Sequence, residues 1–271
     1  MAIRMVSGLI SKGFAAGALV LVLAGCGGAI LQSSWRNHEI RVDGSGSEWE
    51  KSLTRIENAN TALGFYNDRD ALYIAVVPWN QQNQIQVAGM GCVMMFESGD
   101  DTETIGIHFP FGDQAIAVQM SQTLSRSDLH EFTQELAAKE TMLEVLGRDN
   151  AVVAKMTLDE AAEKGIRVSL GEYNGHLLVE MRIPWVFELN GKEYHLPGND
   201  GSLVTIDVET PRQTMRQRED QQDMVQRSGI SGSPFLFTDP GEEDNAVATG
   251  IDLFRMPIDL SIRVRPAFGL E

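Results

Sequence analysis

The stretch His176–Ile183, with the sequence HLLVEMRI, has the clearest two-residue periodicity in this chain of 271 residues. Side chains alternate between the two faces of a β-strand, so the stretch predicts a strand with one apolar face toward a core. Glu180 falls on the opposite face, where we expect either a solvated charge or a clamp for a neighbouring loop. The core-facing positions are Leu177, Val179, Met181 and Ile183, and the opposite positions are His176, Leu178, Glu180 and Arg182.

Other segments repeat this strand signal. The alternation recurs at 204–208 and again at 258–264, and Leu72–Val77 is an almost continuous apolar run, typical of a central strand covered on both faces. Val93–Phe96 predicts a second buried strand, and Ala115–Met120 predicts a strand with alternate residues on one face. The sequence therefore predicts a mainly β protein with an antiparallel, jelly-roll-like β-sandwich.

The segment 127–165 has a different pattern. Apolar residues recur at helical spacing over Ser127–Gly147, and Thr157 with Glu160 forms the signature of a capping box before a short helix that ends at Gly165. We expect a helical insertion over 127–165 that covers an apolar face of a sheet, and a helical lid over a binding site is the alternative.

The first 25 residues resemble a secretory leader. Arg4 and Lys12 give a positive start, and Phe14–Ala24 is apolar but too short to cross a bilayer, which needs about 20 apolar residues. The run Leu23-Ala24-Gly25-Cys26 that follows resembles the lipobox of bacterial lipoproteins. An ordinary signal peptide with an incidental cysteine is the alternative.

The lipoprotein resemblance implies that Cys26 is the first mature residue and carries diacylglycerol and fatty acid such as palmitate. Two or three acyl chains give stable membrane anchoring. The resemblance also implies that residues 26–37 form a lipidated tether. Because Gly27 stands where inner-membrane lipoproteins commonly have aspartate, we expect the outer membrane, facing the periplasm or the cell surface, rather than the inner membrane.

The charge balance is strongly acidic. The formal net charge is −16, and loss of Arg4 and Lys12 with the leader makes it more negative by two units. Such acidity argues against nucleic acid as a partner and against an electrostatic hold on anionic lipid, so we expect a body that stays off the membrane surface. Cys92 is the second of two cysteines and lies among apolar residues, so we expect a small buried side chain rather than a reactive thiol.

Four stretches in order resemble the family-9 carbohydrate-binding modules and the related DOMON-type β-sandwiches. They are Val42–Trp49, Asn67–Val76, Gly91–Glu97 and Gly175–Trp185. The resemblance implies one β-sandwich domain over 38–268. Residues 211–246 are rich in Gln, Arg, Asp, Gly and Ser, so we expect a long mobile loop or an insertion within that domain. It also implies a binding module rather than an enzyme.

The sequence departs from the sugar-binding members of this family at their ligand clamp, which uses two tryptophans. Gln84–Val87 supplies no aromatic residue at the first position, and Phe235 and Phe237 stand near the second. Trp79 and Trp185 remain as candidate ligand-contact residues at strand ends. Trp49, after a glycine-rich turn, is expected to fill a core instead.

No catalytic or metal motif is recognisable in the sequence. The five histidines lack zinc-binding spacing, so we predict no catalytic residues and no metal site. The expected function is a non-catalytic, lipid-anchored binding module of the cell envelope, with a glycan or an envelope protein as its ligand. The alternative is a DOMON-type redox protein that binds haem b through a methionine. The candidate methionines are Met90, Met94, Met95, Met120 and Met181, although methionine also fills cores.

Overall fold

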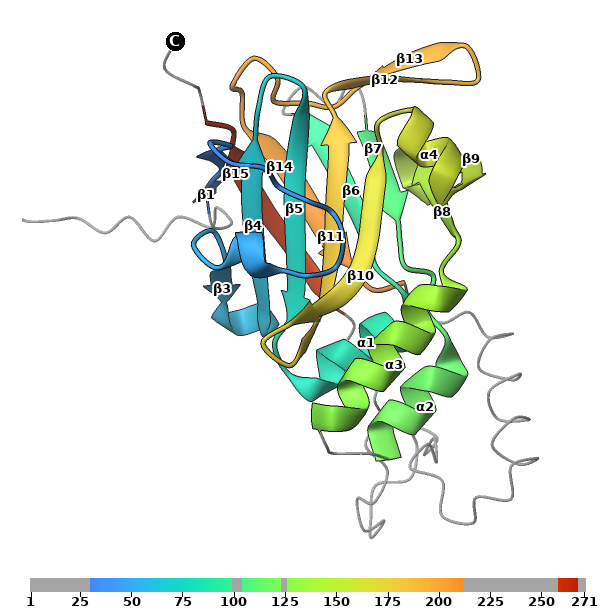
Figure 1. The fold of residues 1–271 in the computed structure, drawn as a ribbon. Helices are drawn as coiled ribbons and strands as arrows, with labels where there is room; N and C mark the ends of the chain where they lie inside the picture. The colour runs from blue at the N-terminus through green and yellow to red at the C-terminus, as the bar shows by residue number, and fades with distance from the viewer. Residues whose placement is uncertain (1–29, 99–103, 123–125, 212–257, 268–271) are drawn as a thin grey trace, which may run out of the picture.

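Two β-sheets pack face to face in the computed structural model, which describes residues 30–98, 104–122, 126–211 and 258–267 (Figure 1). This confirms the predicted mainly β class and the sandwich. Cys26 and nearly all of the segment 211–246, with Phe235 and Phe237, lie outside the described residues, so the predictions about them stay predictions.

We call the larger sheet sheet A. Its seven strands are ordered β1-β15-β14-β6-β7-β8-β9, and neighbours are antiparallel except β1 and β15, which are parallel. Its strands are β1 (Ile30–Gln32), β6 (Val93–Ser98), β7 (Thr104–His108), β8 (Met142–Leu146), β9 (Val152–Thr157), β14 (Val204–Glu209) and β15 (Asp259–Arg265).

We call the second sheet sheet B, and it lies in front of sheet A in Figure 1. Its order is β10-β11-β5-β4-β2, with β3 paired to β4 as well, and a separate hairpin joins β12 to β13. Its strands are β2 (Ser34–Trp35), β3 (Thr54–Ile56), β4 (Thr61–Asn67), β5 (Ala71–Pro78), β10 (Arg167–Tyr173) and β11 (His176–Pro184), and the hairpin strands are β12 (Val186–Leu189) and β13 (Lys192–His195).

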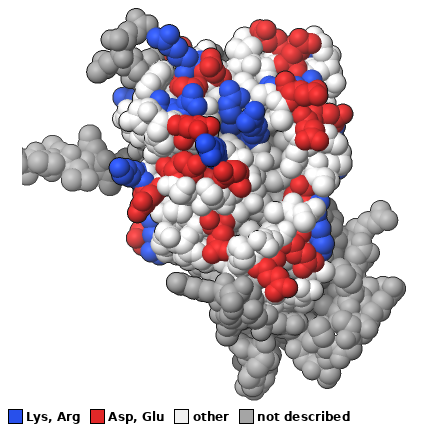
Figure 2. Space-filling view, in the orientation of Figure 1, with Lys and Arg blue, Asp and Glu red and all other residues white. Residues whose placement is uncertain are grey.

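The main core lies between the two sheets. The apolar row predicted for His176–Ile183 is buried there, and β5 is buried along its whole length, as its apolar sequence predicts. The outer face of sheet B is covered in turn by the segment 36–53, whose Ile40 and Trp49 pack on Tyr66 and Tyr73. The central strands β4, β5 and β11 of sheet B are therefore buried on both faces. Figure 2 views this side and shows acidic side chains in several groups over the covering segment and sheet, in keeping with the negative net charge.

Glu180 clamps the covering segment to β11. Its carboxylate is fully buried and accepts hydrogen bonds from the Asp43 N–H at 3.0 Å, the Gly44 N–H at 2.6 Å and the Trp49 indole at 2.6 Å. Burial raises the pKa of Glu180, while the Gly44 and Trp49 hydrogen bonds lower it and so limit the rise. The structure thus decides between the two roles expected for Glu180, and it confirms that Trp49 fills a core.

Four α-helices accompany the sheets. In Figure 1, α1 (Gln81–Met90), α2 (Gln114–Gln122) and α3 (Arg126–Lys139) lie together at one end of the sandwich, and α4 (Leu158–Glu163) lies beside β8 and β9. The capping box of α4 is confirmed, because the Thr157 hydroxyl accepts from the Glu160 N–H and the Glu160 carboxylate accepts from the Thr157 N–H.

The structure corrects two of the predicted segments. Ala115–Met120 is helix rather than strand, because Asp113 caps the free N–H groups of Ala115 and Ile116 and so starts α2. The insertion over 127–165 is only partly helical. Its first helix ends at Lys139, and the alternation of Leu143 and Val145 belongs to β8, which with β9 extends sheet A.

The predicted tether over 26–37 is also corrected, because residues 30–35 belong to the folded body. The strand β1 pairs with β15 in sheet A, and β2 pairs with β4 in sheet B, so one short segment crosses from one sheet to the other. Ser33 is buried at the crossing, where its hydroxyl donates to the Asn67 side-chain oxygen at 2.7 Å. The same Asn67 amide exchanges two hydrogen bonds with the backbone of Ala267.

Candidate functional site

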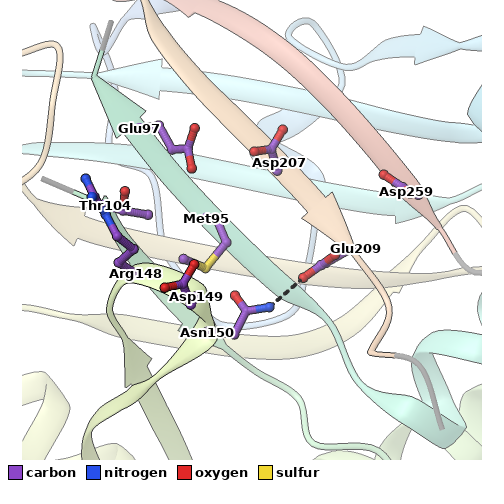
Figure 3. A pocket seen from close by; sticks show the side chains of 9 residues that line it. All are labelled: Met95, Glu97, Thr104, Arg148, Asp149, Asn150, Asp207, Glu209 and Asp259. Atoms are coloured by element: carbon purple, nitrogen blue, oxygen red, sulfur yellow. Dashed lines mark hydrogen bonds between the residues drawn. The ribbon is translucent and has the colours of Figure 1, made fainter. Parts of the chain in front are cut away.

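A groove of about 610 Å³ lies on the outer face of sheet A (Figure 3). Alternation along the strands sets its lining: Met94, Phe96, Ile206 and Val208 point into the main core, so their neighbours on β6 and β14 point outward. β7 contributes Thr104 and β15 contributes Asp259, and the short 3-10 helix η3 (Arg148–Asn150), in the turn between β8 and β9, supplies the remaining three residues. The lining residues are Met95, Glu97, Thr104, Arg148, Asp149, Asn150, Asp207, Glu209 and Asp259.

The floor of the groove is apolar. Met95 of β6 lies directly opposite Gly106 of β7, and a Cβ atom on Gly106 would collide with the Met95 sulfur. Glycine at this position therefore gives the thioether room over the neighbouring strand. Val93 and Leu146 pack with Met95 in a small buried cluster separate from the main core. Met95 is the one apolar residue among the nine that line the groove, so the lining is mainly polar.

The rim of the groove is rich in carboxylates. Five acidic side chains line the groove against one guanidinium group, that of Arg148. Glu209 and Asp259 are directly opposite each other on β14 and β15, an arrangement of like charges that costs stability. This face is therefore not arranged for maximum stability. Its acidic members are Glu97, Asp149, Asp207, Glu209 and Asp259.

The turn between β8 and β9 forms one wall of the groove. Asp149 and Asn150 both adopt left-handed backbone conformations, with φ of 56° and 57°, which are uncommon for residues other than glycine. The Asn150 side-chain amide donates to Glu209 at 3.2 Å. Because β6 and β7 lie between β8 and β14 in sheet A, this hydrogen bond shows that the turn leans across two strands.

A polar cluster lies further along β7 on the same face. The His108 ring is in hydrogen-bond contact with Glu144 at 3.3 Å, and Lys155 contacts the other oxygen of that carboxylate at 3.1 Å. Phe111 packs edge-on against the His108 ring. Burial lowers the pKa of His108, although Glu144 acts in the opposite direction. Sequence reasoning gave this cluster no role, since the three strands that supply it become neighbours only in the folded sheet.

The two candidate tryptophans lie away from the groove and at opposite ends of β5. Trp185 is a core residue: its side chain is 3% exposed, and its indole donates to the Asp68 carbonyl at 2.9 Å. It has no face open to a ligand, so its predicted contact role is corrected. Trp79 is half-buried, and its ring stacks on His176 at 4.6 Å with Arg55 at 5.4 Å. Its own neighbours already occupy much of its surface.

The candidate haem ligands are spread over the fold. Met94 and Met181 are fully buried in the main core, Met95 is the groove floor, and Met90 and Met120 lie on helices α1 and α2. The haem alternative stays a prediction. Cys92 is buried as expected, and burial raises the pKa of its thiol to about 12.

Within the described ranges, no three His, Cys, Asp or Glu side chains are arranged to hold a metal ion. Over the same part of the chain, no helix is both long enough and apolar enough to span a bilayer.

Neither a protein-family model nor a curated protein matches the chain. Among the solved structures that resemble it are two of a family-9 carbohydrate-binding module from Caldicellulosiruptor kristjanssonii. The complex with cellotriose is 11% identical, with a TM-score of 0.32 over 69% of this chain and 79% of that one. The complex with glucose is 10% identical, with a TM-score of 0.30 over 69% and 81% of the two chains. A likeness this distant says nothing about what this chain binds.

Proposed function

We propose that this protein is a non-catalytic, lipid-anchored binding module of the bacterial cell envelope, and that it holds a glycan in the groove of sheet A. The observation that carries the proposal is the groove itself, with the apolar Met95 floor beneath a rim of hydrogen-bonding groups. Sugars present both apolar C–H faces and hydroxyl groups, so they match such a surface.

The polar groups of the rim suit hydroxyl partners in particular. Each sugar hydroxyl both donates and accepts. The carboxylates, such as Asp207 and Glu209, accept hydrogen bonds, while Arg148, Asn150 and Thr104 supply donors. The sequence resemblance to carbohydrate-binding modules supports the same ligand class.

Binding of the mature chain to immobilised glycans tests the proposal. A hydrogen bond to a charged group contributes about 1.5–3 kcal/mol, so Asp207→Asn or Glu209→Gln is expected to weaken affinity by about ten-fold or more. Glu188→Gln, on the exposed face of β12, is the matched control and is expected to leave affinity unchanged.

Two outcomes would contradict this function. Failure of the wild-type chain to bind any glycan on the array would remove the ligand class. A loss of binding in Trp79→Ala, with unchanged binding in the groove variants, would move the site to the end of β5.

The lipid anchor is tested separately. Labelled palmitate is expected to enter the wild-type chain in bacterial cells and not to enter Cys26→Ser. Equal labelling of the two chains would show that Cys26 is not the acylated residue.

A further inference from the structure

The chain between the proposed acylation site and the folded body is very short. Only four peptide steps separate Cys26 from Ile30, where β1 begins. An extended chain spans at most about 3.6 Å per residue, so the start of β1 lies within about 14 Å of the lipidated residue. The body is therefore kept beside the bilayer once Cys26 is acylated.

The point where the folded body begins is also fixed, because residues 30–35 are bound to both sheets. The pairings of β1 with β15 and of β2 with β4 are joined at Ser33, whose N–H donates to the Arg265 carbonyl at 3.0 Å. The anchor thus pulls on one defined edge of the sandwich, the edge where β1 and β15 lie (Figure 1).

The side chains at this edge suit a phospholipid surface. Ile30 is paired with Arg263 and Gln32 with Arg265, and partners in register share a face of the sheet. They lie on the outer face, because the intervening Leu31 and Val264 pack into the main core. Ile30 is 54% exposed and is one of three exposed large apolar residues among those that the structure describes. An exposed isoleucine beside two arginines fits the boundary between lipid headgroups and water.

The outer face of sheet A changes charge along β15. The strand begins at Asp259, on the rim of the acidic groove, and passes Arg263 and Arg265 about 13 Å or more further along, at about 3.3 Å per residue. An anionic membrane attracts the arginine end and repels the acidic end. The same face therefore has one end suited to the membrane and one end suited to the solvent.

We propose that the edge formed by Ile30, Gln32, Arg263 and Arg265 rests on anionic phospholipid headgroups and holds the groove turned away from the bilayer. This inference rests on the lipid anchor of the proposed function. It also revises the expectation that an acidic body stays off the membrane, since the anchor leaves no slack and the local charge at the edge is positive.

Fluorescence quenching on vesicles tests this orientation with the full acylated chain. The vesicles contain phosphatidylethanolamine and phosphatidylglycerol with a headgroup nitroxide quencher. A thiol-reactive fluorophore is placed at Gln32→Cys, and in a matched variant at Val152→Cys. Val152 is 57% exposed on β9, the opposite edge of the same sheet and about 29 Å away at about 4.8 Å per strand. Acylated Cys26 and buried Cys92 do not compete for the label.

We expect strong quenching at position 32 and little at position 152. An arginine near an anionic surface changes the contact equilibrium by about five-fold, so Arg263→Gln combined with Arg265→Gln is expected to remove most of the quenching at position 32. A flexible insertion of about twelve Gly and Ser residues after Gly28 is expected to do the same.

The outcomes separate this inference from the function on which it rests. Acylated protein with equal quenching at the two edges overturns the orientation and leaves the anchor standing. Quenching at position 32 that is unchanged in phosphatidylcholine vesicles and in the double arginine variant overturns the role of the charges. A chain that carries no fatty acid overturns both the anchor and the orientation, whatever glycan it binds.

Discussion

The Trp49 indole donates a 2.6 Å hydrogen bond to the Glu180 carboxylate across 131 positions of sequence. The second carboxylate oxygen accepts from the backbone of Asp43 and Gly44. All the partners of Glu180 are therefore donors, and all lie in the segment that covers sheet B. A single buried carboxylate fastens this segment to β11.

Replacing Glu180 by glutamine is expected to destabilise the fold. The amide oxygen of glutamine replaces one acceptor, but its NH₂ group then faces a donor, and an unsatisfied buried polar group costs about 1–3 kcal/mol. Urea unfolding of Glu180→Gln, with Glu188→Gln on the exposed face of β12 as the control, measures this cost. Equal stability of the two variants would show that the clamp contributes little.

Gly171→Ala is expected to be more damaging. Gly171 of β10 faces Gly44, and a Cβ atom at position 171 would overlap the Gly44 backbone, which cannot rotate away as a side chain can. We expect a loss of about 2–4 kcal/mol in the free energy of unfolding, or failure to fold. Gly147→Ala is the comparison: its new Cβ meets a Val153 methyl at 3.0 Å, so its thermal midpoint is expected to change less. A smaller loss at Gly171 than at Gly147 would contradict the close approach.

Gly106→Ala is expected to change the groove without unfolding the protein. The new Cβ displaces the Met95 side chain, which is flexible, so the stability cost is expected to be about 1 kcal/mol. The Met95 methyl resonance in a methionine-labelled sample is expected to shift, while that of Met181 in the main core does not. Glycan affinity is expected to fall when Met95 is displaced. An unchanged Met95 resonance in Gly106→Ala would show that Met95 does not lie against Gly106.

The contribution of His108 to the stability of the protein is expected to fall as the pH drops from about 7.5 to 5.5. Burial lowers the pKa of His108, so protonation is harder in the folded chain than in the unfolded chain, where histidine titrates near pH 6.5. The free energy of folding therefore keeps the full contribution of neutral His108 above about pH 6.5. This contribution is lost at lower pH, because the unfolded chain then binds a proton that the folded chain does not. His108→Gln is expected to flatten the pH dependence measured by urea unfolding. The exposed His195→Gln is the control, and an unchanged slope in His108→Gln would assign the effect elsewhere.

The Cys92 thiol is expected to be unreactive in the native protein. Its pKa of about 12 leaves very little thiolate at pH 8, and its side chain has no exposed surface. Maleimide labelling of the acylated chain is expected only after denaturant unfolds it, followed by mass spectrometry. Rapid native labelling would show that this part of the core opens readily.

The strand periodicity predicted much of the fold, because each pattern reflects burial that is local to one strand. His176–Ile183 and Leu72–Val77 are examples, and the capping box at Thr157 is another local signal. Ala115–Met120 was predicted wrongly because Ile116 and Met120 satisfy a helical spacing of four as well as a spacing of two. In so short a window, the Asp113 cap decides between the two.

The groove could not be predicted from the sequence in the same way. Glu97 and Thr205 are neighbours in sheet A although more than a hundred residues separate them, since β6 pairs with β14. Such placement depends on strand order, which periodicity does not encode. The prediction for Trp185 was wrong for a related reason. A position just after a strand predicts exposure, but the Trp185 indole donates a buried hydrogen bond to the Asp68 carbonyl in the turn between β4 and β5.

The parallel pairing of β1 with β15 has a mechanical consequence. Because residues 30–35 pair with β15 in sheet A and with β4 in sheet B, and the Ser33 N–H donates to the Arg265 carbonyl, tension on the chain ahead of Ile30 passes into both sheets. If the proposed anchor and glycan site are both present, drag on a captured ligand is carried through sheet A to the amino-terminal attachment. A strand of only three residues becomes the joint that bears this load.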